Sequence, residues 1–285
     1  MQTVNRLDVL RSALAPLRAR GRVALVPTMG ALHEGHLALV AAARELAESV
    51  VVSIFVNPRQ FGPREDLAAY PRSLESDSAL LAQAGAAILW APSAQEMYPV
   101  RYATTVSVAG PSEGLCGDAR PGHFDGVATV VLKLFNQVRP DVAVFGEKDW
   151  QQLAVVRQMA RDLDLEYPRA DAIHAVPTVR EPDGLARSSR NAYLDTAGRA
   201  AAGALPAAMR DAAARIGEGA DIGAALQALR ERLLAAGFTS VDYAELRDGE
   251  TMQPLERVTG PARLFVAARL GGTRLIDNLA VTRAT

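Results

Sequence analysis

Hydrophobic positions in about the first 175 residues alternate between two patterns, and each pattern predicts a different element. Leucines recur at helical spacing over residues 7–17, ahead of Gly21, a candidate helix C-cap. Short apolar runs rich in β-branched residues are typical of buried parallel strands, and they occupy residues 22–27, 49–56, 86–90, 104–108 and 141–145. Helical patterns lie between or after them, ending near Glu48 and covering residues 74–84, 124–138 and 149–163. This alternation predicts an α/β fold, a Rossmann-like doubly wound parallel sheet that binds ligands outside the carboxyl ends of its strands.

The pattern changes near residue 178. Residues 197–237 are rich in alanine and helical in pattern, and residues 239–285 contain short strand patterns such as SVDYAEL and ARLFVAARL. We therefore expect two domains, a Rossmann-like domain over residues 1–178 and a smaller α+β domain over residues 179–285. The strand-like stretch AIHAV places His174 in a structural position.

Composition narrows the function classes. The 285 residues carry 31 Lys and Arg against 32 Asp and Glu, so a net charge of −1 gives no electrostatic footprint for nucleic acid. A single cysteine, Cys116, excludes a disulfide framework within the chain and is expected to be inert. Neither a signal-peptide pattern nor an apolar membrane span is visible, which predicts a cytoplasmic protein. Only Lys133 and Lys148 are lysines among the 31 basic residues, so each is worth inspecting.

The strongest local signal is PTMGALHEGH, residues 27–36, between a predicted strand and a predicted helix. Gly30 and Gly35 permit close approach of the backbone, and a helix N-terminus presents unpaired N–H groups to an anion. His33 and His36 can donate hydrogen bonds to phosphate oxygens and stabilise charge on a departing pyrophosphate. A pair of turn-capping histidines and a two-histidine zinc site are the alternatives, although no third zinc ligand stands at diagnostic spacing.

Two further segments are competent to bind phosphate. Lys148 follows a buried strand in FGEKDWQQ and can reach a phosphate as a point charge, while its neighbour Asp149 suits a helix N-cap, a ribose hydroxyl or Mg²⁺. GLARSSRN, residues 184–191, combines two hydroxyls with two guanidinium groups, as in a mobile clamp over phosphates; a solvated basic loop is the alternative.

A fourth segment, FVNPRQF, offers a site for a small polar substrate. Asn57 and Gln60 supply neutral hydrogen-bond donors and acceptors. A turn at Asn57-Pro58, with no role in binding, is the alternative. The glycine and proline of RPGHFDG, residues 120–126, require nothing beyond turn geometry. Because the three phosphate-competent segments converge at the carboxyl edge of one predicted sheet, the sequence predicts nucleotide binding without a P-loop.

Taken together, these blocks resemble a known family. PTMGALHEGH and GLARSSRN look like the HIGH-type and KMSKS-type motifs of the nucleotidyltransferase superfamily. With FVNPRQF, EDLAAYPR, RPGHFDGVATVV, FGEKDWQQL and RLIDN they resemble the pantoate–β-alanine ligase family nearly end to end. The resemblance implies a homodimeric ligase that condenses pantoate with β-alanine, using ATP and Mg²⁺, through a pantoyl adenylate.

The same resemblance implies roles for individual residues. His36, His33 and Lys148 would be catalytic, and Gln60, Gln152 and Asn57 would bind substrate. Asp77 and Asp149 are the candidate Mg²⁺ ligands. Those implied to bind ATP are Met29, Gly30, Ala31, Leu32, His33, Glu34, Gly35, His36, Gly146, Glu147, Lys148, Asp149, Val179, Arg187, Ser188, Ser189 and Arg190.

Two departures and several alternatives accompany the resemblance. Arg187 stands where the family usually has Met or Leu, and the segment before Pro177 is longer than usual, which leaves the entry of one strand open. An adenylyltransferase of the same superfamily would retain AMP in its product, whereas a ligase releases it. An aminoacyl-tRNA synthetase fragment would need a basic tRNA-binding domain, and a non-catalytic nucleotide-binding regulator would not turn over.

Overall fold

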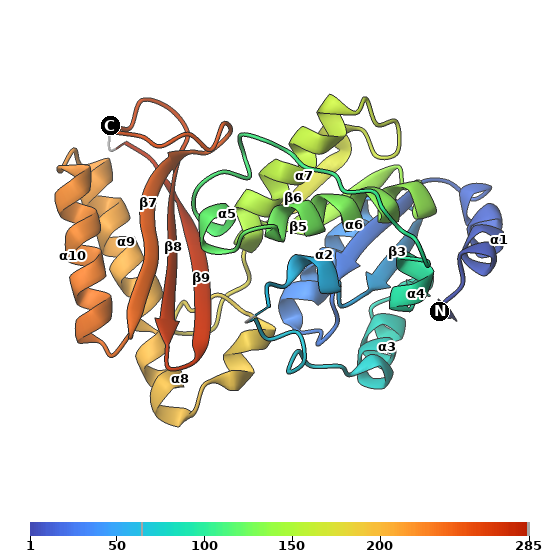
Figure 1. Cartoon of the computed structure of the whole chain (residues 1–285), viewed down its shortest axis with the longest axis horizontal. Helices are drawn as coiled ribbons and strands as arrows, with labels where there is room; N and C mark the ends of the chain where they lie inside the picture. The colour runs from blue at the N-terminus through green and yellow to red at the C-terminus, as the bar shows by residue number, and fades with distance from the viewer. Residues whose placement is uncertain (64, 284–285) are drawn as a thin grey trace.

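A six-stranded parallel sheet forms the centre of the first part of the chain (Figure 1). The structure is a computed structural model that describes residues 1–63 and 65–283. The strands lie in the order β1-β4-β3-β2-β5-β6, and every adjacent pair is parallel. Their bounds are β1 Gln2–Val4, β2 Val23–Thr28, β3 Ser49–Ile54, β4 Ile88–Trp90, β5 Val142–Gly146 and β6 Ile173–Val176. The predicted α/β fold with a parallel sheet is confirmed.

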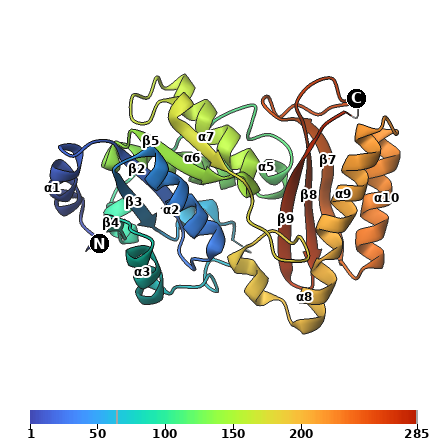
Figure 2. The ribbon, with the colours of Figure 1, turned by 180° about the vertical axis from the view of Figure 1, so that it is seen from behind.

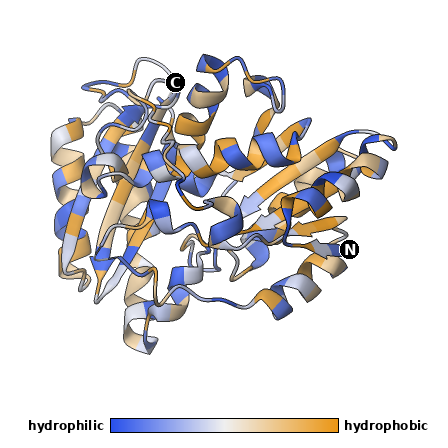
Figure 3. Ribbon diagram, turned by 45° about the vertical axis from the view of Figure 1, so that its right-hand side comes forward, coloured by the Kyte–Doolittle hydropathy of each residue, from blue (hydrophilic) through white to orange (hydrophobic). Residues whose placement is uncertain are grey.

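Helices cover both faces of this sheet. Along β2, Val23 and Leu25 pack into one hydrophobic cluster, whereas Ala24 and Val26 pack into the other, as the two-residue period of a strand requires. The first cluster takes in α1 (Leu7–Arg18), α6 (His123–Val138) and α7 (Trp150–Asp162); the second takes in α2 (Glu34–Leu46) and α3 (Leu74–Gln83). Both faces are therefore buried, which explains the continuous hydrophobic strands in Figure 3.

The last part of the chain forms an antiparallel sheet of β7 (Ser240–Asp248), β8 (Ala262–Leu270) and β9 (Thr273–Val281). The helices α8 (Thr196–Ala202), α9 (Ala204–Gly217) and α10 (Ile222–Ala235) precede it. Figures 1 and 2 show α9 and α10 on the side of this sheet that faces away from the parallel sheet. The opposite face, with Tyr243 and Phe265, joins the hydrophobic cluster of α6 and α7. The division of the chain into two domains near residue 178 stays a prediction. One hydrophobic cluster contains residues from both sides of that point.

Two local predictions are wrong, and one strand was not predicted. Residues 104–108 form no strand; the backbone N–H of Val106 donates instead to Thr129 Oγ1 of α6, at 2.9 Å, so side chains replace a strand partner. The helix α1 ends at Arg18 with Ala19 as its C-cap, whereas Gly21 has a φ of +144° beside the Glu48 carboxylate. The strand β1 was not predicted, because it has three residues and one buried side chain, too few to show the alternation of buried and exposed positions that identifies a strand.

The longer segment before Pro177 does not disturb the sheet. It passes through a 3-10 turn, η3 (Ala170–Ala172), and enters β6, which pairs with β5 from Ile173 to Val176. His174 lies on this strand, away from the cavity described below. In the part of the chain that the structure describes, none of the helices is long and apolar enough to span a membrane.

Candidate active site

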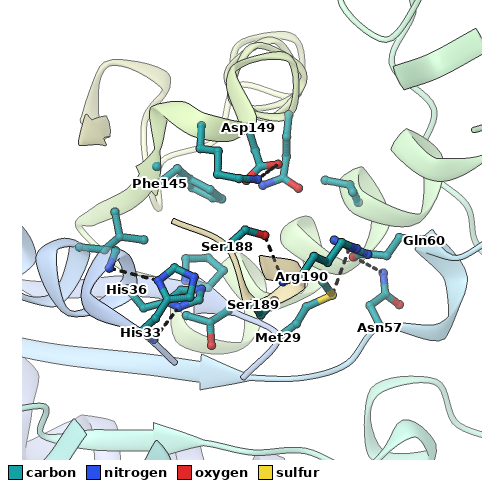
Figure 4. A pocket seen from close by; sticks show the side chains of 18 of the residues that line it. Met29, His33, His36, Asn57, Gln60, Phe145, Asp149, Ser188, Ser189 and Arg190 are labelled. Atoms are coloured by element: carbon teal, nitrogen blue, oxygen red, sulfur yellow. Dashed lines mark hydrogen bonds and ion pairs between the residues drawn. The ribbon is translucent and has the colours of Figure 1, made fainter. Parts of the chain in front are cut away.

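A cavity of about 220 Å³ opens at the carboxyl ends of the central strands. After β2 the chain builds β3 and β4 on one side, and later β5 and β6 on the other, so the connections diverge between β2 and β5. Ligands of open α/β sheets bind at such a switch point. Figure 4 shows His33 and His36 side by side at one end of the cavity and Asn57 and Gln60 at the other. The segments expected to bind phosphate and substrate are therefore brought together.

The two histidines belong to the first turn of α2. His33 is the N-cap: its Nδ1 accepts from the N–H of Gly35 at 3.1 Å, and Nδ1 of His36 accepts from the N–H of His33 at 3.3 Å. This capping box occupies both Nδ1 atoms as acceptors, so each neutral imidazole carries its proton on Nε2. A side chain at Gly35 would place its Cβ 2.9 Å from the His33 ring, which accounts for the glycine.

Both imidazoles are neutral in this environment. Burial, followed by electrostatic repulsion between the two neighbouring imidazoles when both are protonated, lowers the pKa of His36 to about 3. Burial and then the charge of Lys148 lower the pKa of His33. At pH 7 the start of α2 therefore presents two neutral Nε2–H donors, while the capping box already pairs the backbone N–H groups of His33 and Gly35.

Lys148 differs from the other cations that line the cavity. Arg120 donates to Glu65 at 2.9 Å, and Arg190 donates to both oxygens of Asp66 at 3.0 Å. Arg187 contacts Glu34 at 3.3 Å and Glu181 at 3.1 Å, so both guanidinium groups of the loop are paired with carboxylates. Lys148 has only a long contact with Asp149, 3.8 Å between Nζ and Oδ1. Its ammonium is the cavity cation least engaged by a carboxylate, among the described residues.

Gln60 is held in place by its neighbours. It closes the 3-10 turn η1 (Pro58–Gln60), its Oε1 accepts from Asn57 Nδ2 at 3.1 Å, and its Nε2 donates to Met29 Sδ at 3.3 Å. A thioether is a weak acceptor, so this Nε2–H can donate to a substrate oxygen in place of the sulfur. His123 Nδ1 donates to the backbone oxygen of Gln60 at 2.9 Å, and Arg120 reaches the same oxygen at 3.3 Å.

Asn57 serves a different purpose from the one expected. It is 1% exposed, and its Nδ2 also donates to the backbone oxygen of Gly126 at 3.0 Å, while its Oδ1 accepts from Tyr98 Oη at 2.8 Å. With its amide engaged in this way, Asn57 orients Gln60 and leaves no group free for a substrate.

Gly126 was expected to do no more than shape a turn, which is wrong. It lies inside α6, where a Cβ would come within 2.3 Å of the backbone oxygen of Arg59 and 2.7 Å of Gln60 Cα. The missing side chain lets α6 support the turn that carries Gln60.

We expect Gly126→Ala to lower the free energy of unfolding by about 1–3 kcal/mol, because the backbone atoms it meets cannot rotate away. The displaced turn should also raise KM for any substrate that binds beside Gln60. Thermal unfolding and steady-state kinetics would measure both effects. Gly260→Ala is the control, since a Cβ there meets nothing within 4 Å. Unchanged stability in Gly126→Ala would show that the helix and the turn are not in fixed contact.

The expected metal ligands divide between two places. Asp77, expected to bind Mg²⁺, is 2% exposed, and its carboxylate accepts from the N–H groups of Ala31 and Leu32, both at 2.9 Å. It therefore shapes the loop behind the histidines and does not line the cavity. Asp149 does line it. Over residues 1–63 and 65–283, no three His, Cys, Asp or Glu side chains converge as a metal site.

Most of the expected site residues line the cavity. Those that do are Met29, His33, Gly35, His36, Asn57, Gln60, Gly146, Lys148, Asp149, Gln152, Val179, Arg187, Ser188, Ser189 and Arg190. Those that do not are Gly30, Ala31, Leu32, Glu34, Glu147 and Asp77. Sequence reasoning missed Tyr70, Arg120 and His123, which also line it. Their only signal was membership of the blocks EDLAAYPR and RPGHFDG.

Comparisons with known proteins agree with this geometry. Residues 2–280 match the family described as pantoate-beta-alanine ligase. A pantothenate synthetase of Novosphingobium aromaticivorans is 63% identical over 283 residues, which cover 99% of each chain. The crystal structure of pantothenate synthetase from Thermus thermophilus superposes with a TM-score of 0.92 at 50% identity, covering 99% of this chain and 100% of that one. A pantoate-beta-alanine ligase from Francisella tularensis, crystallised with beta-gamma ATP and beta-alanine, gives a TM-score of 0.82 at 32% identity, covering 98% and 97%.

Proposed function

The chain belongs to the pantoate-beta-alanine ligase family, and from that premise we propose that its cavity joins the two substrates in two steps. The protein is an enzyme of pantothenate biosynthesis with pantoate-beta-alanine ligase activity. ATP, pantoate and β-alanine are its substrates in this proposal. The observation that carries the proposal is the meeting of a histidine-bearing helix N-terminus, Lys148 and two glutamines in one cavity.

In the first step, a carboxylate oxygen of pantoate attacks the α-phosphorus of ATP. The bond to the bridging oxygen breaks, so pyrophosphate leaves with the electron pair and pantoyl adenylate remains. Lys148 and the Nε2–H groups of His33 and His36 stabilise the negative charge that develops on pyrophosphate. Gln60 and Gln152 hold pantoate in line without competing as nucleophiles.

In the second step, the amine of β-alanine attacks the acyl carbon of pantoyl adenylate. A C–N bond forms, the amine loses a proton, and AMP leaves with the electrons of the acyl–oxygen bond. Shielding the adenylate from water prevents its hydrolysis. Ser188 and Ser189 lie on the segment best placed to cover it, close to Tyr70, whose Oη lies 3.4 Å from Ser189 Oγ.

The nucleotide contacts follow the position of each cavity segment. Met29, Gly35 and Gly146 lie where the backbone can approach phosphates, and the backbone of Val179 meets the adenine. Gly30, Ala31, Leu32, Glu34 and Glu147 act indirectly, by holding these loops.

Mg²⁺ fits this site as an ion carried by the nucleotide. Magnesium in such enzymes is held by one or two carboxylates together with substrate phosphates, and Asp149 supplies one carboxylate at the cavity wall. When bound, the ion would offset charge on the phosphates. Asp149 would hold it, and Asp77 would take no part.

Product analysis tests the function directly. Incubated with ATP, Mg²⁺ and pantoate, the enzyme should release pyrophosphate and form pantoyl adenylate, and AMP should appear in step with pantothenate once β-alanine is added. An adenylyltransferase would keep AMP in its product, and a regulator would give no turnover. Either result would overturn the proposal.

We expect Gln60→Ala to raise KM for pantoate about tenfold while KM for ATP changes less than about threefold, because one or two hydrogen bonds to pantoate are lost. Steady-state titration of each substrate measures the split. Gln83→Ala, at an exposed position on α3, is the control. A change confined to KM for ATP would place Gln60 outside the pantoate site.

The oligomeric state and the cellular location are also part of the proposal. We propose a homodimer, which analytical ultracentrifugation would test. We place the reaction in the cytoplasm, where ATP is abundant, and cell fractionation would test that assignment.

A further inference from the structure

The C-terminal block RLIDN, residues 274–278, has no part in the reaction described above. Two of its residues, Asp277 and Asn278, are polar yet only 2% and 4% exposed. Both lie on β9, in the antiparallel sheet, and each reaches a segment that lines the ATP cavity. Burying two such groups costs free energy unless every polar atom finds a partner, so their partners indicate their role.

Asn278 holds the turn that carries Lys148. Its Nδ2 donates to the backbone oxygens of Glu147 and Lys148, both at 2.9 Å, and its Oδ1 accepts from Arg263. Two carbonyls on one side and a guanidinium on the other permit only this orientation of the amide. Arg263 also donates to the carboxylate of Glu147 at 3.0 Å and stacks over Trp150, with Cζ 3.5 Å from the ring centroid. The turn η2 (Glu147–Asp149) is thereby fixed to β9 through its backbone.

Asp277 holds the base of the serine-bearing segment. Its carboxylate accepts from Arg180 through two bonds, at 2.7 and 2.9 Å, and Arg180 donates to the backbone oxygen of Gly184 at 2.9 Å. The N–H of Arg187 donates to the backbone oxygen of Val179 at 2.9 Å, which closes a small hairpin just before Ser188. The bidentate pair therefore sets where this hairpin leaves the sheet.

We propose that Asp277 and Asn278 are positioning residues that together set the distance between Lys148 and the Ser188–Ser189 segment. They are consecutive on one strand, so a single peptide unit links the anchors of the two ATP-binding segments. Neither residue lines the cavity, and each acts through another residue. The inference rests on the proposed function, because it assigns Lys148 to the adenylation step.

Asn278→Asp tests the first anchor. The variant keeps the size of the side chain and the acceptor for Arg263, but it replaces the donor with a carboxylate oxygen that faces two carbonyl oxygens. Formation of pantoyl adenylate from ATP and pantoate should slow by about 10- to 100-fold, as a small misplacement of a catalytic group typically does. Aminolysis of supplied pantoyl adenylate should change less than about threefold, since that step needs no charge stabilisation on pyrophosphate. Equal losses in both half-reactions would mean a general structural defect and would overturn the proposal.

A double-mutant cycle tests whether Asn278 acts through Lys148. In a Lys148→Ala background, Asn278→Asp should slow adenylate formation by less than about threefold, because the group it positions is already absent. Losses that multiply would overturn the proposal. If Asn278→Asp does not fold, Asn278→Ala removes the same two donations without adding charge and enters the same cycle.

Asp277→Asn tests the second anchor and has a matched control. It weakens the hold on Arg180, so KM for ATP should rise by about tenfold. Asp242→Asn changes a carboxylate of the same sheet that accepts from Arg274 at 2.7 Å and does not line the cavity, so it should leave KM unchanged. Equal effects of the two variants would overturn the proposal for Asp277. A wild-type chain that forms no pantoyl adenylate would instead overturn the proposed function.

Discussion

Replacing Lys148 with alanine is expected to slow the formation of pantoyl adenylate by about two to four decades, as the loss of a preorganised charge at a transition state typically does. The expected effect is large because the other cavity cations are occupied. Arg120, Arg187 and Arg190 each hold a carboxylate within 3.3 Å, whereas the nearest carboxylate to Lys148 Nζ lies at 3.8 Å. Rapid-quench measurement of a single turnover with ATP and pantoate would isolate this step.

Lys133 provides the matched control for that experiment. Its ammonium lies 4.8 Å from the ring centroid of Tyr102 and does not line the cavity. Lys133→Ala should therefore leave the single-turnover rate unchanged. Near-wild-type adenylate formation in Lys148→Ala would remove the lysine from the catalytic assignment.

Replacing His36 with alanine should slow the same step by about two to four decades, for a related reason. The imidazole is neutral, with a pKa near 3, and its Nδ1 is occupied by the N–H of His33 at 3.3 Å. Alanine therefore removes an oriented Nε2–H donor and also opens the capping box at the start of α2. Single-turnover kinetics measure the first loss, and thermal unfolding measures the second, which should be about 1 kcal/mol.

His174→Ala serves as the control for His36→Ala, because His174 lies on β6 outside the cavity. His36→Asn retains a side-chain group that can cap the helix. If His36→Asn is as stable as wild type and still slow, the loss belongs to the reaction. If both variants react at the wild-type rate, His36 has only a structural role.

The sequence patterns predicted the parallel sheet well, because its strands are buried on both faces and are long enough to show it. They failed where the determinant lies outside the segment itself. Val106 looks like part of a strand, yet its N–H bonds to Thr129 of α6. The strand β1 has one buried side chain, Val4, so its pairing with β4 depends on tertiary packing.

The site was predictable in position more than in detail. Motifs at strand ends brought His36, Lys148 and Gln60 together, because parallel strands end at one edge of the sheet. The partners of each side chain could not be predicted. The sequence around Asn57 does not indicate that its amide donates to Gln60 and Gly126. Nor does the sequence around Asp77 indicate that its carboxylate accepts from backbone N–H groups.

The pairing of the cavity arginines also bears on how ATP arrives. An unpaired cluster of cations would attract the nucleotide from a distance and accelerate diffusional encounter, an effect that salt screens beyond about 8 Å at physiological ionic strength. Here Arg187 and Arg190 are already neutralised by Glu34, Glu181 and Asp66, so little long-range field remains at the entrance. The association rate of ATP should then depend only weakly on ionic strength. After contact, the phosphates would replace those carboxylates as partners of the two arginines.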